Sequence, residues 1–393
     1  MMKKCNYYKR FCSGCGMCSF DRKIEMKYKD GFLTPELTAK DMDFCSKYCI
    51  SSYNPKKCDW KDSIWGNYKG LYYGYSTDSE TRKRASSGGV ITSICDYLLT
   101  EHVIDAIIHT GQDEEYPWRT KTYCTINRNE LRERSGSRYA QSAPLKDVLK
   151  FVEKGKKYAY VGKPCDVYSL KKYIEYHEEY KESFYLTISF FCAGVPSENA
   201  NLKLLATLGC VPDECKSISY RGNGWPGRAE VINKAGEVNS IDYQQSWGKI
   251  LGRDIRAMCR FCMQGTGESA DISCGDAWYL TEDRKPSFIE ADGRNVIFGR
   301  TQIGDKVVLE AEKYGYLTIE RSENIINSLR YSQPFQYERK ATMFQKILAM
   351  RCMCQDTPND NLKILFSIKS DISVSRKFEI FKGTIGRIVR RKI

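Results

Sequence analysis

Cys12-Ser13-Gly14-Cys15-Gly16-Met17-Cys18 places three thiols at C-x2-C-x2-C spacing, with glycines between them. Such a loop can wrap three thiolates around an iron–sulfur cube, because small residues let backbone amides turn in and donate hydrogen bonds to the sulfides. A structural zinc site is the alternative, since C-x2-C pairs are common in zinc ribbons. Zinc sites normally use two separated pairs, so the third Cys favours a 4Fe-4S cluster.

The fourth ligand of this cluster has to come from farther along the chain. A bacterial ferredoxin run continues to a Cys-Pro four residues after the third Cys, where this chain has Arg22. Cys45, Cys49 and Cys58 are the candidates, and Cys49 is our working choice. The first 58 residues hold seven Cys, one short of the eight that two clusters need. We therefore predict one cluster in this segment.

Composition and charge narrow the class of protein. The 393 residues are 41% hydrophobic and 28% charged, which is typical of a soluble globular protein of two or three domains. No apolar run approaches the ~18 residues that a membrane span needs. The first residues also lack the apolar segment of a signal peptide. We therefore expect a cytoplasmic protein, in which clustered Cys are metal ligands or redox groups rather than disulfides.

The basic charge favours acidic partners. A net charge of +13, from 62 Lys+Arg and 49 Asp+Glu, suits a phosphate-bearing cofactor, an acidic ferredoxin, an anionic membrane surface or nucleic acid. The basic residues are scattered along the chain and form no basic-aromatic stripe, so we predict no nucleic-acid partner.

Beyond the cysteine-rich start, the pattern predicts an α/β (mixed α+β) fold. We divide the chain into a ferredoxin-like iron–sulfur module (1–62), an α/β flavin-binding domain (66–330) and a helical, basic C-terminal extension (331–393). Strands and helices alternate in the middle of the chain, which predicts a partly parallel sheet. We expect helices at 90–101, 144–153, 167–176 and 198–208, strands at 103–109, 158–161 and 184–191, and strand pairs over 217–242.

Four further Cys stand near predicted strand ends, where functional groups of such sheets gather. Cys165 follows the strand at 158–161, Cys192 ends the strand at 184–191, and Cys259 and Cys262 form a C-x2-C before the run 270–276. For any single one of them, a packing role is the better interpretation. Together they supply the number of thiols that a second 4Fe-4S cluster needs.

A Ser-Gly-Gly loop opens the predicted helix at 90–101. Free N–H groups at a helix start can bind phosphate, so Ser87, Gly88 and Gly89 are candidates for a phosphate-bearing ligand. The alternative is an ordinary N-cap formed by Ser87.

These motifs, in their order along the chain, resemble those of the coenzyme F-420 hydrogenase/dehydrogenase β-subunit family. The resemblance covers about residues 66–330, behind a ferredoxin-like module. It rests on Ser86-Ser87-Gly88-Gly89, Gly162-Lys163-Pro164-Cys165, Phe191-Cys192-Ala193-Gly194-Val195-Pro196, Tyr220-Arg221-Gly222-Asn223-Gly224-Trp225-Pro226-Gly227, and Cys259 through Trp278.

The resemblance implies a flavoprotein with FAD on the α/β domain and a 4Fe-4S cluster beside it. Cys165, Cys192, Cys259 and Cys262 would hold this inner cluster, as the family's motifs imply. Carried over by position, the expected flavin contacts are Ser86, Ser87, Gly88, Gly89, Ser137, Arg138, Tyr139 and Gln141.

The function we expect is that of an iron–sulfur flavoprotein oxidoreductase. Electrons would pass between a ferredoxin-type donor, the two clusters and FAD, with hydride transfer to or from a small-molecule substrate. The alternatives are an electron-transfer subunit without its own substrate site and a metal-stabilised binding module. No acid or base can be assigned. Lys163, where the family usually has a small residue, and Asp276 are weak candidates, and the three His are expected at the surface or at strand ends.

The C-terminal segment 376–393 has apolar residues at helical spacing with Lys and Arg around them. Two interpretations fit this pattern. One is peripheral contact with an anionic membrane, and the other is a basic helix docked on its own domain.

Overall fold

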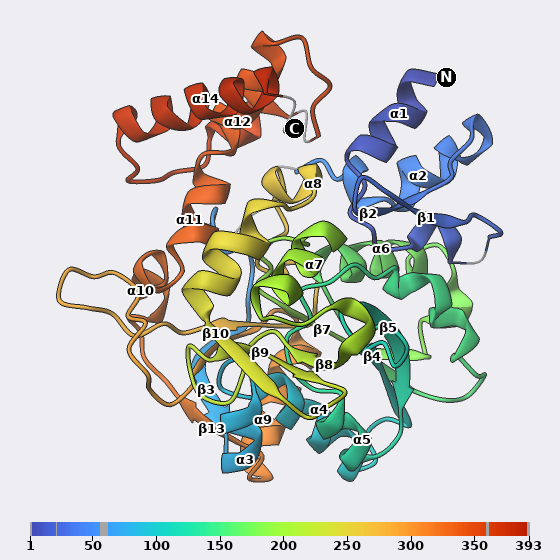
Figure 1. Ribbon diagram of the computed structural model, residues 1–393, viewed down its shortest axis with the longest axis vertical. Helices are drawn as coiled ribbons and strands as arrows, with labels where there is room; N and C mark the ends of the chain where they lie inside the picture. Colours follow the sequence, from blue (N-terminus) through green and yellow to red (C-terminus); the bar gives the residue numbers. More distant parts are fainter. Residues whose placement is uncertain (1, 21, 56–61, 359–360, 391–393) are drawn as a thin grey trace.

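The computed structural model describes residues 2–20, 22–55, 62–358 and 361–390. Cys58, one candidate for the fourth ligand, lies outside these residues. In Figure 1 the N-terminal module (blue) and the C-terminal helices (orange to red) lie side by side on one end of a central α/β body. Helix α8 (Ala257–Arg260) lies between them.

A mixed sheet forms the centre of the body. Its eight strands stand in the order β13-β3-β12-β11-β7-β6-β4-β5 within the described residues. Strands β11, β7, β6 and β4 run parallel to one another, whereas the other pairs are antiparallel. The bounds are β3 (Gly70–Ser76), β4 (Ala106–Gln112), β5 (Thr120–Thr125), β6 (Tyr158–Gly162), β7 (Phe184–Phe190), β11 (Ile272–Asp276), β12 (Asn295–Gly299) and β13 (Leu317–Glu320). The predicted α/β class with a partly parallel sheet is confirmed.

Helices cover both faces of this sheet. Apolar residues of α4 and α9 pack on one face, and those of α10 and α12 pack on the other. The helices of the body are α3 (Ser79–Arg84), α4 (Val90–Thr100), α5 (Arg128–Glu133), α6 (Pro164–Ile174), α7 (Glu198–Thr207) and α9 (Gln302–Lys313). The central strands are therefore buried on both sides, as parallel strands usually are.

Three predicted elements differ from the structure. The helix expected at 167–176 spans Pro164–Ile174. The expected helix at 144–153 is a 3-10 helix at Pro144–Lys150. Leu145 and Val148 are three residues apart and fully buried, which suits the three-residue turn of a 3-10 helix. The strand expected from residue 103 begins at Ala106, because the amides of Val103 and Ile104 still bond Leu98 O at the end of α4.

Two smaller sheets lie outside the body's main sheet. Strands β8 (Cys215–Ser219), β9 (Arg228–Asn233) and β10 (Val238–Asp242) form an antiparallel sheet, which confirms the strand pairs expected over 217–242. In the N-terminal module, β1 (Met26–Lys29) and β2 (Phe32–Pro35) form a hairpin. Asp30 and Gly31 turn it with positive φ angles of 52° and 77°, as a tight hairpin turn requires.

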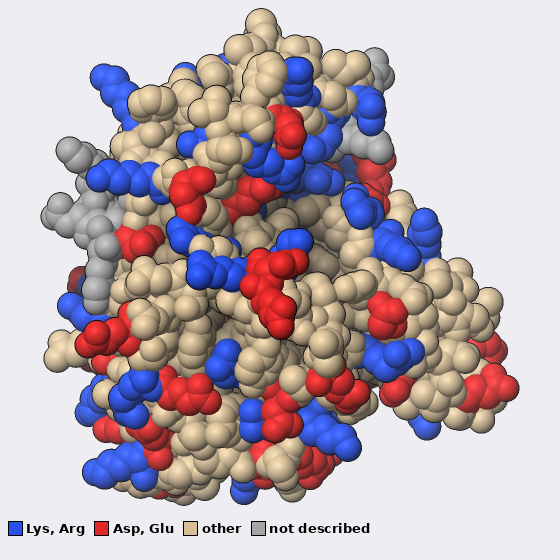
Figure 2. Space-filling view, turned by 90° about the vertical axis from the view of Figure 1, so that its left-hand side faces the viewer, with Lys and Arg blue, Asp and Glu red and all other residues tan. Residues whose placement is uncertain are grey.

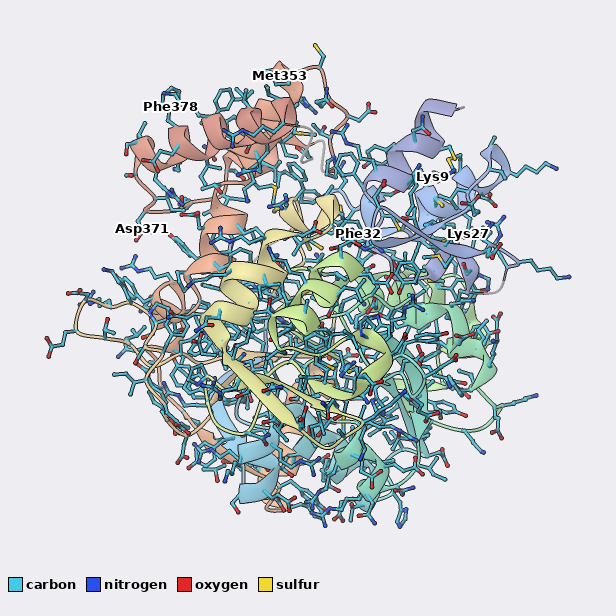
Figure 3. All side chains as sticks on the ribbon, viewed as in Figure 1. Lys9, Lys27, Phe32, Met353, Asp371 and Phe378 are labelled. Carbon is cyan, nitrogen blue, oxygen red and sulfur yellow. The ribbon has the colours of Figure 1, made fainter. Side chains whose placement is uncertain are left out.

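The N-terminal module also holds α1 (Met2–Arg10) and α2 (Met42–Tyr48). It packs tightly on the α/β body. Leu145 N donates to Cys15 O at 2.9 Å, and the Phe11 ring meets the Phe261 ring edge-on. In Figure 3, Phe32 lies where the hairpin faces the body. The module therefore reaches the body through the cysteine loop as well as the hairpin.

The C-terminal region is helical, with α10 (Ile325–Ser332), α11 (Pro334–Ala341), α12 (Met343–Cys352), α13 (Leu362–Phe366) and α14 (Val374–Val389). Helix α14 packs along α12, while Phe378 stays exposed on its outer side (Figure 3), and Val374 at its start is exposed too. Figure 2 shows Lys and Arg gathered on the upper part of one face of the molecule. Among the described residues, no helix combines the length and apolarity that crossing a membrane requires.

Candidate functional site

Five cysteine thiols line a narrow cavity in the N-terminal module. They belong to Cys12, Cys15, Cys18, Cys45 and Cys49. Both described candidates for the fourth ligand therefore reach the same place as the C-x2-C-x2-C loop. The choice of Cys49 over Cys45 stays a prediction. Cys5 is engaged elsewhere, because its thiol donates to Leu37 O at 3.1 Å.

The backbone of the loop turns its amides toward sulfur, as its glycines lead us to expect. Gly14 N donates to Cys12 Sγ at 3.2 Å, and Met17 N donates to Cys15 Sγ at 3.5 Å. Gly14 and Gly16 have φ angles of 73° and 81°, which side-chain-bearing residues rarely adopt. A Cβ at Gly16 would also lie 2.9 Å from Ala143 O. The loop conformation depends on both glycines.

Burial strongly disfavours free thiolates in this cavity. It raises the pKa of the Cys15, Cys18 and Cys49 thiols, and the charge of the neighbouring Cys residues raises each pKa further. Deprotonation of these thiols therefore needs positive charge bound among the sulfur atoms. A metal ion or an iron–sulfur cluster provides that charge. The chemistry of the donor set fits such a group.

The second cysteine group lies where the central strands end. Cys192 N donates to Gly265 O at 2.8 Å, and Val195 N donates to Cys259 Sγ at 3.4 Å. Burial raises the pKa of Cys192 to about 12, and nearby Cys259 and Cys262 contribute to the rise. Cys192 is also among the charges that raise the pKa of Cys165, so the charges of the four predicted residues act on one another.

One detail of the sequence argument about this group is wrong. Cys259 and Cys262 do not follow a strand of the main sheet; Cys259 lies on α8 and Cys262 just after it, ahead of β11. The segment after them returns to the loop that follows β7, where Gly265 O accepts from Cys192 N. Their position thus depends on tertiary packing, which a strand-end rule does not describe.

The two cysteine groups approach each other at the start of α6. Burial is the main cause that raises the pKa of Cys165, and the charges of Asp166 and Cys15 raise this pKa further. Asp166 is completely buried and accepts from Lys163 N at 3.0 Å and from Lys163 Nζ at 2.8 Å. Among the described residues, no group of three or more His, Cys, Asp or Glu side chains is arranged to hold a single metal ion. The thiolates of a 4Fe-4S cube, by contrast, each bind a different iron.

A cavity of about 620 Å³ adjoins the second cysteine group. Of the predicted flavin contacts and catalytic candidates, those that line it are Ser86, Ser87, Gly89, Ser137, Arg138, Tyr139, Lys163 and Asp276. Cys192 lines it too, whereas Cys165, Cys259 and Cys262 do not.

Gly88 and Gln141 do not line this cavity, contrary to our expectation. A Cβ at Gly88 would lie 2.9 Å from Asn295 Oδ1 and from Gly74 O, so this glycine allows close packing behind the loop. Gln141 is buried between the body and the hairpin, where its Oε1 accepts from Leu33 N at 3.3 Å and from Arg256 Nη2 at 2.6 Å.

One part of the cavity wall can bind an anion. Helix α4 begins after Gly89, where Val90 N donates to Asn295 Oδ1 at 3.4 Å, and the first residues of the helix line the cavity. Nearby, the partly buried Arg138 guanidinium donates to the carbonyl oxygens of Ile218, Pro117 and Arg119 and forms no ion pair with a described residue. A helix start and an uncompensated cation both favour bound phosphate.

The opposite part of the wall carries a buried ion pair that sequence reasoning missed. Arg221 Nη1 donates to Asp276 Oδ2 at 2.8 Å, and the guanidinium lies over the rings of Tyr243 and Trp278. Burial acts to lower the pKa of Arg221. The charge of Asp276 acts in the opposite direction, and the pKa lies above its usual range. The signal in the sequence is the Tyr220–Gly227 motif, to which we assigned no role.

His109 also lines the cavity, although we expected it at a surface or strand end. It is buried on β4, and its Nε2 lies 2.9 Å from Thr125 Oγ1. Burial lowers the pKa of His109 to about 4, so the ring is neutral near pH 7. The sequence holds three His residues, and their spacing gives no signal that His109 lines a cavity.

Comparisons with known proteins identify the family of this chain. The family model for the N-terminal part of the coenzyme F420 hydrogenase/dehydrogenase β subunit matches residues 71–150, and the model for its C-terminal part matches residues 155–324. The chain belongs to this family. Cys165, Cys192, Cys259 and Cys262 all fall inside the second match, whereas the N-terminal module precedes both. The predicted family is thereby confirmed, and it is a family of oxidoreductase subunits.

Curated relatives cover most of this chain. It is 22% identical over 302 residues to the coenzyme F420 hydrogenase subunit β of Methanothermobacter thermautotrophicus, covering 75% of this chain and 99% of the relative. It is 24% identical over 277 residues to the F420-dependent formate dehydrogenase subunit β of Methanocaldococcus jannaschii, covering 69% and 67%. A chain of the F420-reducing NiFe hydrogenase complex from Methanosarcina barkeri has a similar fold, with a TM-score of 0.56, 20% identity and coverage of 76% and 98%.

Proposed function

We propose that this family member is an iron–sulfur flavoprotein oxidoreductase that moves electrons between a ferredoxin-type redox protein and a small molecule bound in the large cavity. Bound 4Fe-4S clusters supply one-electron chemistry, and bound FAD joins it to two-electron chemistry such as hydride transfer. The observation that carries the proposal is the succession of two cysteine groups and one large cavity, each adjoining the next.

The first cluster would be held by Cys12, Cys15 and Cys18, with Cys49 as the fourth ligand. The second would be held by Cys165, Cys192, Cys259 and Cys262. The loop glycines and inward amides support the first assignment. The family match over 155–324 supports the second. Lys163, paired with Asp166 beside Cys165, places a cation next to the second group, where it favours the more negative, reduced state of a cluster.

FAD would lie in the large cavity, with its diphosphate at the start of α4 and near Arg138. The volume of about 620 Å³ is within the range of cofactor sites. Ser86, Ser87, Gly89, Ser137 and Tyr139 complete this part of the wall. Tyr139 contributes an aromatic face, packed beside the Trp247 ring. The remaining part, with the Arg221–Asp276 pair, is left for the substrate.

The partners of this chain follow from its charge and from its relatives. A net charge of +13 favours an acidic redox protein, and Lys and Arg gather on one face. The curated relatives named above are subunits of larger enzymes, which also supports the alternative of an electron-transfer subunit. Exposed Phe366 and Phe378 on α13 and α14 suit a partner protein.

The test is the iron, sulfide, zinc and flavin content of the anaerobically purified full chain, with its visible spectrum before and after dithionite. About eight iron and one FAD per chain are expected for two 4Fe-4S clusters and a flavin. Cys15→Ser and Cys192→Ser should each remove about half of the iron. Cys124→Ser, a partly buried thiol in neither group, is the matched control. Zinc without flavin would overturn the proposal.

A further inference from the structure

Tyr160 is a buried tyrosine on β6 whose hydroxyl has no hydrogen-bond partner among the described residues. It packs in the same apolar cluster as Cys15, together with Leu145, Val167 and Leu170. Burial raises the pKa of Tyr160 well above its usual value, and the charges of Asp166, Cys15 and Cys165 act in the same direction. The hydroxyl therefore remains protonated, and charge in either cysteine group acts on it.

Gly162 directs this hydroxyl. It stands two residues after Tyr160, on the same face of β6. A Cβ at this position would lie 2.5 Å from Tyr160 Cε1 and 2.9 Å from the hydroxyl oxygen. The tyrosine side chain thus occupies the space that a side chain at 162 would fill, and its hydroxyl reaches the carboxyl end of the strand. The loop with Cys165 begins there.

Asp166, whose charge acts on this hydroxyl, already has donors of its own. Asp166 accepts from Lys163 N and Lys163 Nζ through Oδ2, and from the Cys165 thiol at 3.8 Å through Oδ1. A buried donor without an acceptor is costly, and such groups usually serve something that binds there.

We propose that Tyr160 is a positioning residue that donates a hydrogen bond to sulfur of the N-terminal iron–sulfur cluster and thereby raises the reduction potential of that cluster. The inference rests on the proposed function, because it needs a cluster at Cys12, Cys15 and Cys18. A donor to cluster sulfur stabilises the reduced state, which carries more negative charge. Removing the donor therefore makes the cluster harder to reduce.

The test is a redox titration of Tyr160→Phe in the full chain, followed by electron paramagnetic resonance. At a fixed potential, the ratio of reduced to oxidised N-terminal cluster should fall about tenfold, which corresponds to about 59 mV for one electron. Tyr158→Phe is the matched control. Tyr158 lies on the same strand and in the same apolar cluster, but its hydroxyl accepts from Glu153 N at 3.1 Å, away from the cysteine groups.

A second variant keeps the inference testable if Tyr160→Phe loses its iron. Site-specific 3-fluorotyrosine at position 160 keeps the hydroxyl and makes it a stronger donor, so the potential should shift upward. Unchanged potentials in both variants, with iron present, overturn the inference. A shift confined to the Cys165 cluster overturns the assignment to the N-terminal one. Wild-type protein without iron is a different result, because it overturns the proposed function itself.

Discussion

Arg256 joins the N-terminal module to the α/β body, and replacing it should loosen the module. Its buried Nη2 donates to Leu33 O at 2.5 Å and to Gln141 Oε1 at 2.6 Å, and its guanidinium lies over the Phe32 ring. A Cβ at Gly14 would lie 2.5 Å from the same nitrogen, so the guanidinium packs directly on the cysteine loop. One side chain thus contacts the hairpin, the loop and the body.

The size of the effect of Arg256→Met follows from these contacts. Two short hydrogen bonds from a charged donor contribute about 1.5–3 kcal/mol each, or about 3–6 kcal/mol together. Removing a buried cation recovers part of this, because desolvation of the charge no longer opposes folding. We expect a net loss of about 3 kcal/mol in the free energy of opening the module. That corresponds to about a hundredfold higher population of the open state.

Hydrogen exchange measures this opening directly. In Arg256→Met, the hydrogen-bonded amides of β1 and β2 should exchange about a hundredfold faster, while those of α4 keep their wild-type rates. Arg253→Met is the matched control, since Arg253 is exposed on the same segment and donates to the local Gly248 O. A change of less than threefold in the hairpin would refute the reasoning.

Three further predictions concern the cavity and the C-terminal helices. Arg138→Met should lower FAD retention at least tenfold on gel filtration, whereas Arg132→Met, which loses a cation that is paired with Asp78 and does not line the cavity, should retain FAD. Burial lowers the pKa of Lys346 to about 7, so the unfolded chain binds one more proton than the folded protein between pH 7 and 10. The free energy of unfolding should therefore rise over this range by at most about 1.4 kcal/mol per pH unit. In denaturant titrations, Lys346→Met should abolish this rise. Protein lacking residues 372–393 should bind anionic liposomes less than the full chain on co-sedimentation; equal binding would contradict membrane contact through α14.

The sequence predicted the central fold well where local and tertiary signals agree. Strands β6 and β7 are apolar runs of strand length, buried on both faces, and α4 and α7 have clear starts and helical spacing. The order of the sheet could not be predicted in the same way. Strand β3 pairs with β12 and β13, which lie more than 200 residues later in the chain, and no local pattern encodes that pairing.

The candidate site could be predicted where the spacing of residues in the sequence determines the local geometry. The C-x2-C-x2-C loop signals its own geometry, because glycines between thiols have few other uses. Arg221 and Gln141 show the limit. Arg221 faces Asp276 from 55 positions away, and Gln141 ties the hairpin to the body although a neighbouring residue, Tyr139, lines the cavity. A motif predicts which segment reaches a site, but side-chain direction depends on packing.

Packing, rather than sequence spacing, also holds the two cysteine groups in place relative to each other. If the N-terminal module were only tethered, electron transfer would depend on how often it met the body. Instead, Cys15 O accepts from Leu145 N, and the buried Arg256 packs on Gly14. Cys15 itself shares an apolar cluster with β6, the strand that leads to Cys165. The separation between the groups is therefore set by the packed core of the body, so substitutions that loosen this contact should slow electron transfer before they change either cysteine group.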